Sequence, residues 1–105
     1  MSQSFIIIHV SFPKNFDSLN LCKQLIESKL AICIHKSNEI TSFYEWDNHF
    51  ESSCEYVLQI KTKKTHFSDI ERLISADHPY DVPEFISIPI DDLSQSYRHW
   101  AESLI

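Results

Sequence analysis

The residues best suited to chemistry lie in one short segment, 76–90, where acids, a histidine, a tyrosine and prolines occur together. His78 offers an imidazole, and Asp77, Asp81 and Glu84 supply carboxylates close to it in the chain. Imidazole combined with carboxylate suits copper, zinc or nickel without choosing among them. We therefore expect His78 to be the strongest metal-ligand candidate, with Asp77 as a weaker oxygen donor.

Two prolines make this segment a rigid connection. Pro79 and Pro83 each lack a backbone N–H and push the preceding residue toward extended geometry, so no helix runs through 78–83. The helix before the loop must therefore end near Asp77, and the following strand begins near Glu84. A rigid loop between a helix end and a buried strand is a common position for functional polar side chains.

Composition indicates one soluble globular domain, residues 1–105, with 43% hydrophobic and 23% charged residues. The net charge of −6 argues against nucleic acid as the main partner and favours cations over anions. Glycine is absent, which excludes phosphate-cradling loops, dinucleotide-binding fingerprints and glycine-flanked nucleophiles. We expect no enzymatic activity. The acids outside the loop, Glu55 among them, are expected to be solvated.

Cysteine usage and the N-terminus bear on location. Cys22, Cys33 and Cys54 are odd in number and widely spaced, as in a protein of a reducing compartment. The N-terminus lacks a basic region, and the apolar run 5–10 is too short for a signal core or a membrane span. We expect a cytoplasmic protein that is not attached to a membrane.

Hydrophobic patterning divides the chain into alternating elements. Strands are expected at 5–12, 30–35, 40–46, 50–62 and 84–90. The last one is expected to be buried, and Pro89 should stop it or confine it to an edge of the sheet. Helices are expected at 17–29, from a Thr65 cap to about 77, and from Ser94 or Ser96 onward. The buried stripe of the first helix is expected to comprise Leu19, Cys22, Leu25, Ile26 and Leu30. This order predicts an α+β ferredoxin-like sandwich, βαββαβ plus a C-terminal helix, whose antiparallel sheet has both main helices on one face.

The third and fourth strands are expected to form a hairpin that turns at 47–49. Without glycine, positions with positive φ must use Asn or Asp, so Asn48 is the expected left-handed residue. The hairpin also carries four aromatic residues, Phe43, Tyr44, Trp46 and Phe50. So much aromatic surface predicts a subunit interface that includes Tyr44 and Trp46; alternatively, the rings cap one end of a single core. A second copy of the chain is the simplest cover for the open face of the sheet.

Several motifs occur in a specific order between about residue 5 and residue 101. They are Leu30-Ala31 with Cys33, Ile40-Thr41-Ser42-Phe43-Tyr44-Glu45-Trp46, Ile60-Lys61-Thr62, His78-Pro79-Tyr80-Asp81-Val82-Pro83-Glu84, and Tyr97 with Trp100. In order and spacing the chain resembles the CutA divalent-cation tolerance family. The resemblance implies a ferredoxin-like subunit that assembles into a homotrimer, with a role in tolerance of copper and other divalent cations and no defined catalytic reaction.

The resemblance also implies an altered metal site. In some bacterial members a cysteine late in the first strand and two adjacent histidines are implicated in copper binding. Here Val10 and Asp77 stand at two of these positions, and only His78 is retained. The implied ligands are therefore His78 and Asp77, and the implied ion is Cu²⁺ or another divalent cation, with no other cofactor.

A second hypothesis rests on the likeness between the family's fold and that of PII signalling proteins. On this reading, clefts between subunits bind a small molecule or a partner protein. An apolar cleft lined by Tyr80, Trp46 and Trp100, with Glu84 shaping the loop, favours this hypothesis, whereas convergence of His78 with acidic groups favours metal binding. A hydrolase would require a nucleophile–base pair that no motif marks.

Overall fold

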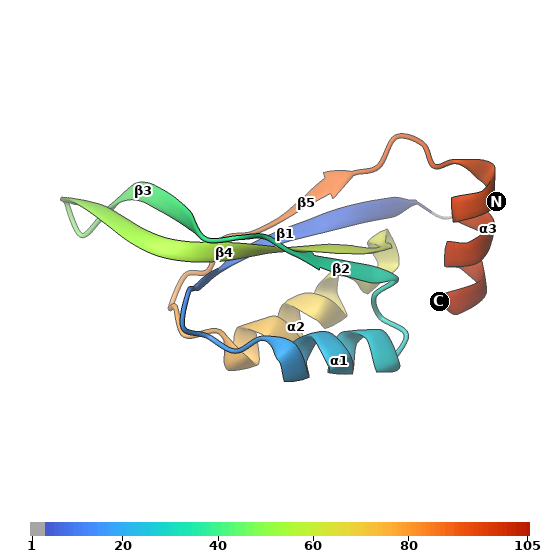
Figure 1. Cartoon of the computed structure of the whole chain (residues 1–105), viewed down its shortest axis with the longest axis horizontal. Coiled ribbons are helices and arrows are strands. Elements are labelled where there is room, and N and C mark those ends of the chain that lie inside the picture. Colours follow the sequence, from blue (N-terminus) through green and yellow to red (C-terminus); the bar gives the residue numbers. More distant parts are fainter. Residues whose placement is uncertain (1–3) are drawn as a thin grey trace.

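The computed structural model describes residues 4–105, in which two helices cover one face of a long sheet and a third lies at one end (Figure 1). The strands are β1 (Phe5–Pro13), β2 (Cys33–Lys36), β3 (Ile40–Trp46), β4 (His49–Lys63) and β5 (Phe85–Pro89). The helices are α1 (Leu19–Glu27), the short 3-10 helix η1 (Lys64–His66), α2 (Phe67–Asp77) and α3 (Gln95–Leu104). No helix in residues 4–105 is long and apolar enough to cross a membrane.

The sheet has the strand order β2-β4-β1-β5, with antiparallel neighbours throughout, and β3 pairs with the outer half of β4. Alternate side chains of β1 point toward the helices, because successive residues of a strand face opposite sides. Ile8 and Phe12 of β1 are fully buried there with Leu25 of α1 and Ile70 of α2. The predicted α+β fold with an antiparallel sheet is therefore confirmed, while a single chain does not test the predicted trimer.

The hairpin of β3 and β4 projects beyond the helices and gives the chain dimensions of 47 × 27 × 24 Å (Figure 1). Its last pair joins Trp46 to His49, which leaves a two-residue turn. Asp47 and Asn48 have φ values of 54° and 64°, the left-handed conformation that twisted hairpins favour at both central positions. The prediction of a positive φ at Asn48 is confirmed.

The first helix differs from its prediction in bounds and in buried face. It spans Leu19–Glu27 rather than 17–29, and its buried residues are Leu21 and Leu25. Leu19, which was expected inside, is 63% exposed, and Ile26 is also exposed. The predicted stripe is confirmed for Leu25, which is buried, and for Cys22 and Leu30, which pack against the core. It was wrong for Leu19 and Ile26 because this segment offers more than one apolar set at helical spacing. The contact of Leu21 and Leu25 with the sheet decides between them.

The chain after α1 corrects a second expectation. Lys29 has a φ of 65°, so the expectation that only Asn or Asp would adopt positive φ is wrong. The backbone N–H groups of Leu30 and Ala31 both donate to the carbonyl of Leu25. These bonds close the helix end, and the strand predicted from residue 30 therefore begins only at Cys33.

The caps of the later helices were predicted with mixed success. Thr65 lies inside η1, and α2 begins at Phe67 after His66, which makes no side-chain capping bond, so the predicted Thr65 cap is wrong. Of the two predicted starts of α3, Ser94 and Ser96, the structure selects Ser94, whose hydroxyl accepts the backbone N–H of Tyr97 at 3.2 Å.

The strand β5 is less buried than predicted. Ile86 and Ile88 pair with His9 and Ile7 of β1 and share the sheet face that the helices do not cover. Both isoleucines are exposed in the single chain. The prediction of a buried strand is therefore wrong for one isolated chain. The expectation that Pro89 would stop the strand or confine it to an edge is confirmed, because β5 ends at Pro89 and is the edge strand of the sheet.

Replacing Lys29 with glycine should stabilise the fold by roughly 0.5–1 kcal/mol, because glycine adopts positive φ without a steric penalty. Asn48→Gly should have a smaller effect, since asparagine already tolerates this conformation. The control is Lys23→Gly on the exposed side of α1, which should destabilise by about 1 kcal/mol. Urea denaturation measures all three; a destabilised Lys29→Gly variant would contradict the backbone argument.

Candidate functional site

His78 lies buried beneath the loop that follows α2, with only 9% of its surface exposed. Its Nε2–H donates to the carbonyl oxygen of Ser11 on β1 at 2.7 Å, and its Nδ1 accepts the backbone N–H of Tyr80 at 3.1 Å. These two roles require a neutral ring with its proton on Nε2. The ring also stacks on Phe12, with centroids 4.5 Å apart. The side chain thus fastens the loop to β1.

Within one chain, His78 and Asp77 differ in their surroundings, and the predicted metal site stays a prediction. Asp77 is exposed at the last position of α2. Within residues 4–105, no group of three or more His, Cys, Asp or Glu side chains is arranged to hold a metal ion. An ion bound to His78 would have to displace either the Ser11 carbonyl or the Tyr80 N–H. The isolated chain therefore offers no preformed site to the predicted ligand pair.

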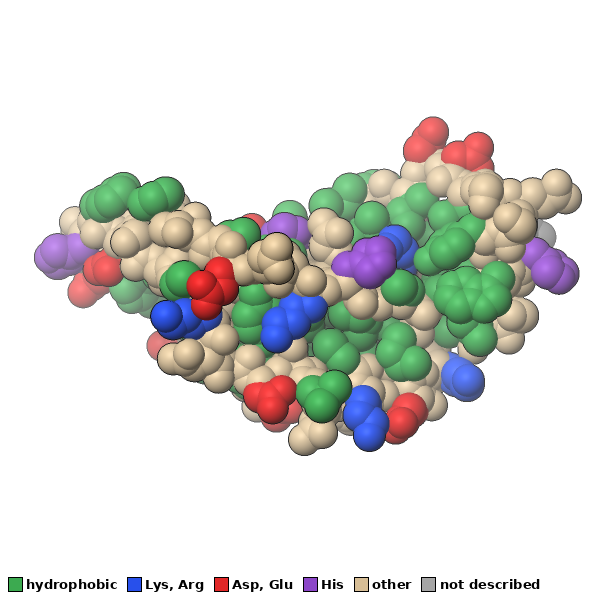
Figure 2. Space-filling model, viewed as in Figure 1, with side chains coloured by type: hydrophobic (Ala, Val, Ile, Leu, Met, Phe, Trp, Pro, Cys, Tyr) green, Lys and Arg blue, Asp and Glu red, His purple; other side chains and the backbone are tan. Residues whose placement is uncertain are grey.

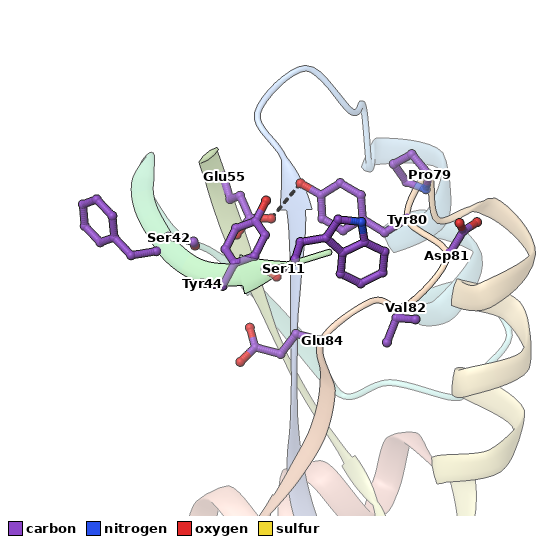
Figure 3. Close-up of a pocket in the computed structure, with 11 residues that line it drawn as sticks. Ser11, Ser42, Tyr44, Glu55, Pro79, Tyr80, Asp81, Val82 and Glu84 are labelled. Carbon is purple, nitrogen blue, oxygen red and sulfur yellow. Dashed lines mark hydrogen bonds between the residues drawn. The ribbon is translucent and has the colours of Figure 1, made fainter. Parts of the chain in front are cut away.

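A cleft of about 710 Å³ opens between β3 and the loop, above the open face of the sheet (Figure 3). Tyr44 and Trp46 line it from β3, and Tyr80 and Glu84 line it from the loop and its junction with β5. This volume lies within the usual range for small-molecule sites. Four of the five residues predicted for an interface or a cleft are therefore brought together.

The fifth, Trp100, does not line this cleft. It lies in α3 at the opposite end of the molecule from the hairpin, where its ring is 5.5 Å from that of Tyr97 and remains partly exposed. The expected cleft shared by Tyr80, Trp46 and Trp100 lies between subunits, so it stays a prediction that a single chain does not test. The distance between α3 and the hairpin depends on the tertiary structure, so it could not be predicted from positions in the sequence.

The polar centre of the cleft is a hydrogen bond from the Tyr80 hydroxyl to Oε2 of Glu55, 2.7 Å long (Figure 3). Glu55 extends from β4 and is only 4% exposed. Burial, together with the neighbouring carboxylate of Glu55, raises the pKa of Tyr80 to about 12. A tyrosine phenol is protonated at neutral pH, so the Tyr80 hydroxyl acts as a hydrogen-bond donor that holds the carboxylate in place, and the raised pKa extends this role into the alkaline range.

Glu55 is the site residue that sequence reasoning missed. The alternation of β4 correctly placed it on the face opposite Tyr56 and Leu58, and that face was interpreted as solvated. It is covered instead by the loop, whose Tyr80 lies 25 positions further along the chain. Glu55 differs from the exposed acids only in its contact with Tyr80, which lies far from it in the sequence. No local sequence pattern therefore identifies Glu55 as a site residue.

The raised pKa of Tyr80 makes a specific contribution to stability. The folded state holds this proton more tightly than the unfolded state, so the contribution is complete below about pH 10 and is lost as pH rises through about 12. Stability of the wild type should therefore fall more steeply over this range than that of Tyr80→Phe. Denaturation at several pH values compares the two slopes; equal slopes would contradict the assignment. Glu55→Gln should lower the pKa of Tyr80, as read from tyrosinate absorbance.

Residues 6–103 match the CutA1 divalent ion tolerance protein family. The protein CutA homolog of Xenopus laevis is 32% identical over 105 residues, which cover 100% of this chain and 70% of that protein. The chloroplastic protein CutA of Arabidopsis thaliana is 33% identical over 98 residues, which cover 93% of this chain and 54% of that protein. The chain thus spans little more than half the length of the plant relative. Because that relative is named chloroplastic, the cytoplasmic location of this chain stays a prediction.

Solved structures agree with the sequence comparison. The crystal structure of CutA1 from Oryza sativa matches with a TM-score of 0.89 and 29% identity, covering 97% of this chain and 94% of that chain. Sequence and fold therefore agree over nearly the whole described chain. The chain belongs to the CutA1 divalent ion tolerance protein family, as the order of its motifs predicted.

Proposed function

We propose that this chain serves in divalent-ion tolerance as a homotrimer, and that the aromatic cleft binds a small ligand and is its working site. The observation that supports this proposal is the cleft itself, which has a volume of about 710 Å³. Tyr44, Trp46 and Tyr80 line it together with the buried carboxylate of Glu55. Small-molecule sites are typically concave and mostly apolar, with a few well-placed polar groups. The tolerance role follows from the family to which the chain belongs.

Binding of Cu²⁺ or another divalent cation by His78 and Asp77 has weaker support. Each ring nitrogen of His78 already has a partner inside the chain. Ligation would sacrifice one of these buried hydrogen bonds and leave its partner unsatisfied, at a cost of about 1–3 kcal/mol. We therefore assign His78 the role of fixing the loop, and the metal role of this pair stays a prediction.

Two exposed apolar surfaces support assembly from copies of this chain. At the hairpin tip, Phe43 and Phe50 are 67% and 78% exposed, and their rings stack 6.0 Å apart. On the open sheet face, Ile86 and Ile88 are exposed. Figure 2 shows hydrophobic side chains gathered on the projecting hairpin and again near α3. In the part of the chain that the structure describes, β3 and β5 also each have an edge without a partner strand. A closed ring of copies removes these surfaces and edges from water.

The hairpin tip provides a test of assembly that leaves the cleft carboxylate untouched. Phe50→Ala should raise the dissociation constant of the trimer at least about tenfold, because buried aromatic anchors dominate the energy of such interfaces. Leu19→Ala is the control, since Leu19 is similarly exposed but lies on α1. Sedimentation velocity measures both variants. A wild-type monomer, or equal dissociation constants for the two variants, would contradict the proposed assembly.

His78→Ala should destabilise the fold by about 2–4 kcal/mol, because it leaves the Ser11 carbonyl without its donor and removes a ring packed on Phe12. Exposed Asp77→Ala should change stability by less than about 0.5 kcal/mol. Urea denaturation measures both effects, and dialysis followed by metal analysis compares their uptake of Cu²⁺ and Zn²⁺ with that of the wild type. Lost metal uptake in both variants with little loss of stability would instead restore the metal hypothesis.

A further inference from the structure

The charge of the cleft restricts the ligands that suit it. Glu55, Asp81 and Glu84 line it, whereas no Lys, Arg or His is among the residues that do. One of these acids, Glu84, has an imidazole beside it, because Nε2 of His9 lies 3.6 Å from Oε1 of Glu84. A cleft lined by one sign of charge attracts ligands of the opposite sign. Phosphorylated and other anionic ligands would find no basic partner on these walls.

Glu55 is the one buried acid among these three. It is 4% exposed, and its Oε2 accepts a hydrogen bond from the neutral Tyr80 hydroxyl. None of the ion pairs in residues 4–105 includes Glu55. A buried carboxylate is costly unless a cation or several hydrogen bonds compensate for the water it has lost. In Figure 3 its side chain extends into the cleft toward Tyr80, so a cationic ligand there is well placed to pair with the carboxylate.

The remaining walls are suited to the same kind of ligand. Phe43, Tyr44, Trp46 and Tyr80 contribute four aromatic rings to the lining. The face of an aromatic ring attracts a cation, most strongly where water is excluded, and cages of such rings bind quaternary ammonium groups. Aromatic walls also accommodate an apolar body, which a hydrated metal ion lacks. Within the described residues, no cluster of three or more metal-ligating side chains competes with this interpretation.

We propose that the cleft binds a small organic cation, with its ammonium group held by the carboxylate of Glu55 and the rings of Trp46 and Tyr80. The inference rests on the proposed function, because it names the ligand class of the same cleft. Asp81 and Glu84 at the rim raise the local concentration of such cations, and the rings recognise the alkyl groups around the charge.

Tetramethylammonium is a suitable probe, and tert-butanol is a neutral molecule of similar shape. The chain has two tryptophans, Trp46 in the cleft and Trp100 in α3, so the ¹H–¹⁵N spectrum of the whole protein contains a reporter and an internal control. Tetramethylammonium should shift the Trp46 indole signal in a saturable way and leave that of Trp100 in place. tert-Butanol should bind at least about tenfold more weakly. Trp100→Phe assigns the two signals.

Glu55→Gln isolates the charge, because the amide keeps an oxygen that can accept the Tyr80 hydroxyl. This variant should bind tetramethylammonium at least about tenfold more weakly. Glu71→Gln makes the same charge change on the exposed side of α2 and should leave affinity unchanged. Retained dispersion of the amide signals verifies that each variant is folded.

The possible outcomes distinguish an error in the assigned ligand class from an error in the proposed ligand-binding function of the cleft. Equal affinity for tert-butanol and tetramethylammonium, or an unaffected Glu55→Gln variant, would overturn the organic-cation assignment and leave the cleft as a ligand site. Failure of both probes to shift Trp46 at high millimolar concentration would overturn the assignment and the proposed ligand-binding function together. A cleft occupied by a neighbouring copy would give this second result, and dilution to the monomer would identify it by moving the Trp46 signal.

Discussion

The site depends on the way His78 fastens the loop between α2 and β5. A neutral imidazole donates to the Ser11 carbonyl and accepts the Tyr80 N–H, so one buried side chain satisfies a backbone group on β1 and another in the loop. Pro79 and Pro83 remove the helical alternatives for this segment. With its backbone fixed, the loop holds the Tyr80 ring against the sheet, where its hydroxyl reaches Glu55. The histidine that looks like a ligand in the sequence therefore works as a structural link.

The same link explains why an acid is tolerated inside the cleft. Glu55 extends from the sheet face that the helices leave open, and the loop covers it rather than water. The Tyr80 phenol donates to that carboxylate, and desolvation and the adjacent carboxylate raise the pKa of Tyr80, so the donor persists into the alkaline range. A single neutral donor provides only part of the compensation that a buried carboxylate requires. The structure thus combines aromatic walls with an acid that benefits from a cationic neighbour.

Much of the fold was predictable, because period-two strands and amphipathic helices recur in an order that permits few topologies. Asn48 at the hairpin turn and Ser94 at the α3 cap followed from local chemistry. The burial of Leu21 rather than Leu19 could not be predicted from local chemistry. Both leucines belong to apolar sets at helical spacing on α1, and only packing against the sheet decides which set is buried. The site was predicted in part: Trp46 and Tyr80 do meet, but the inward orientation of His78 and the contact of Tyr80 with Glu55 depend on tertiary structure.

The central claim is that copies of this chain form a trimer whose clefts hold an organic ligand. Native mass spectrometry of the protein purified gently from cells, without added metal, tests it most directly. The account predicts a trimer that carries up to one small organic adduct per subunit, and it predicts that the adducts are lost from a Glu55→Gln trimer. A monomer, or a trimer whose only adducts are metal ions that disappear in a His78 variant, would contradict it.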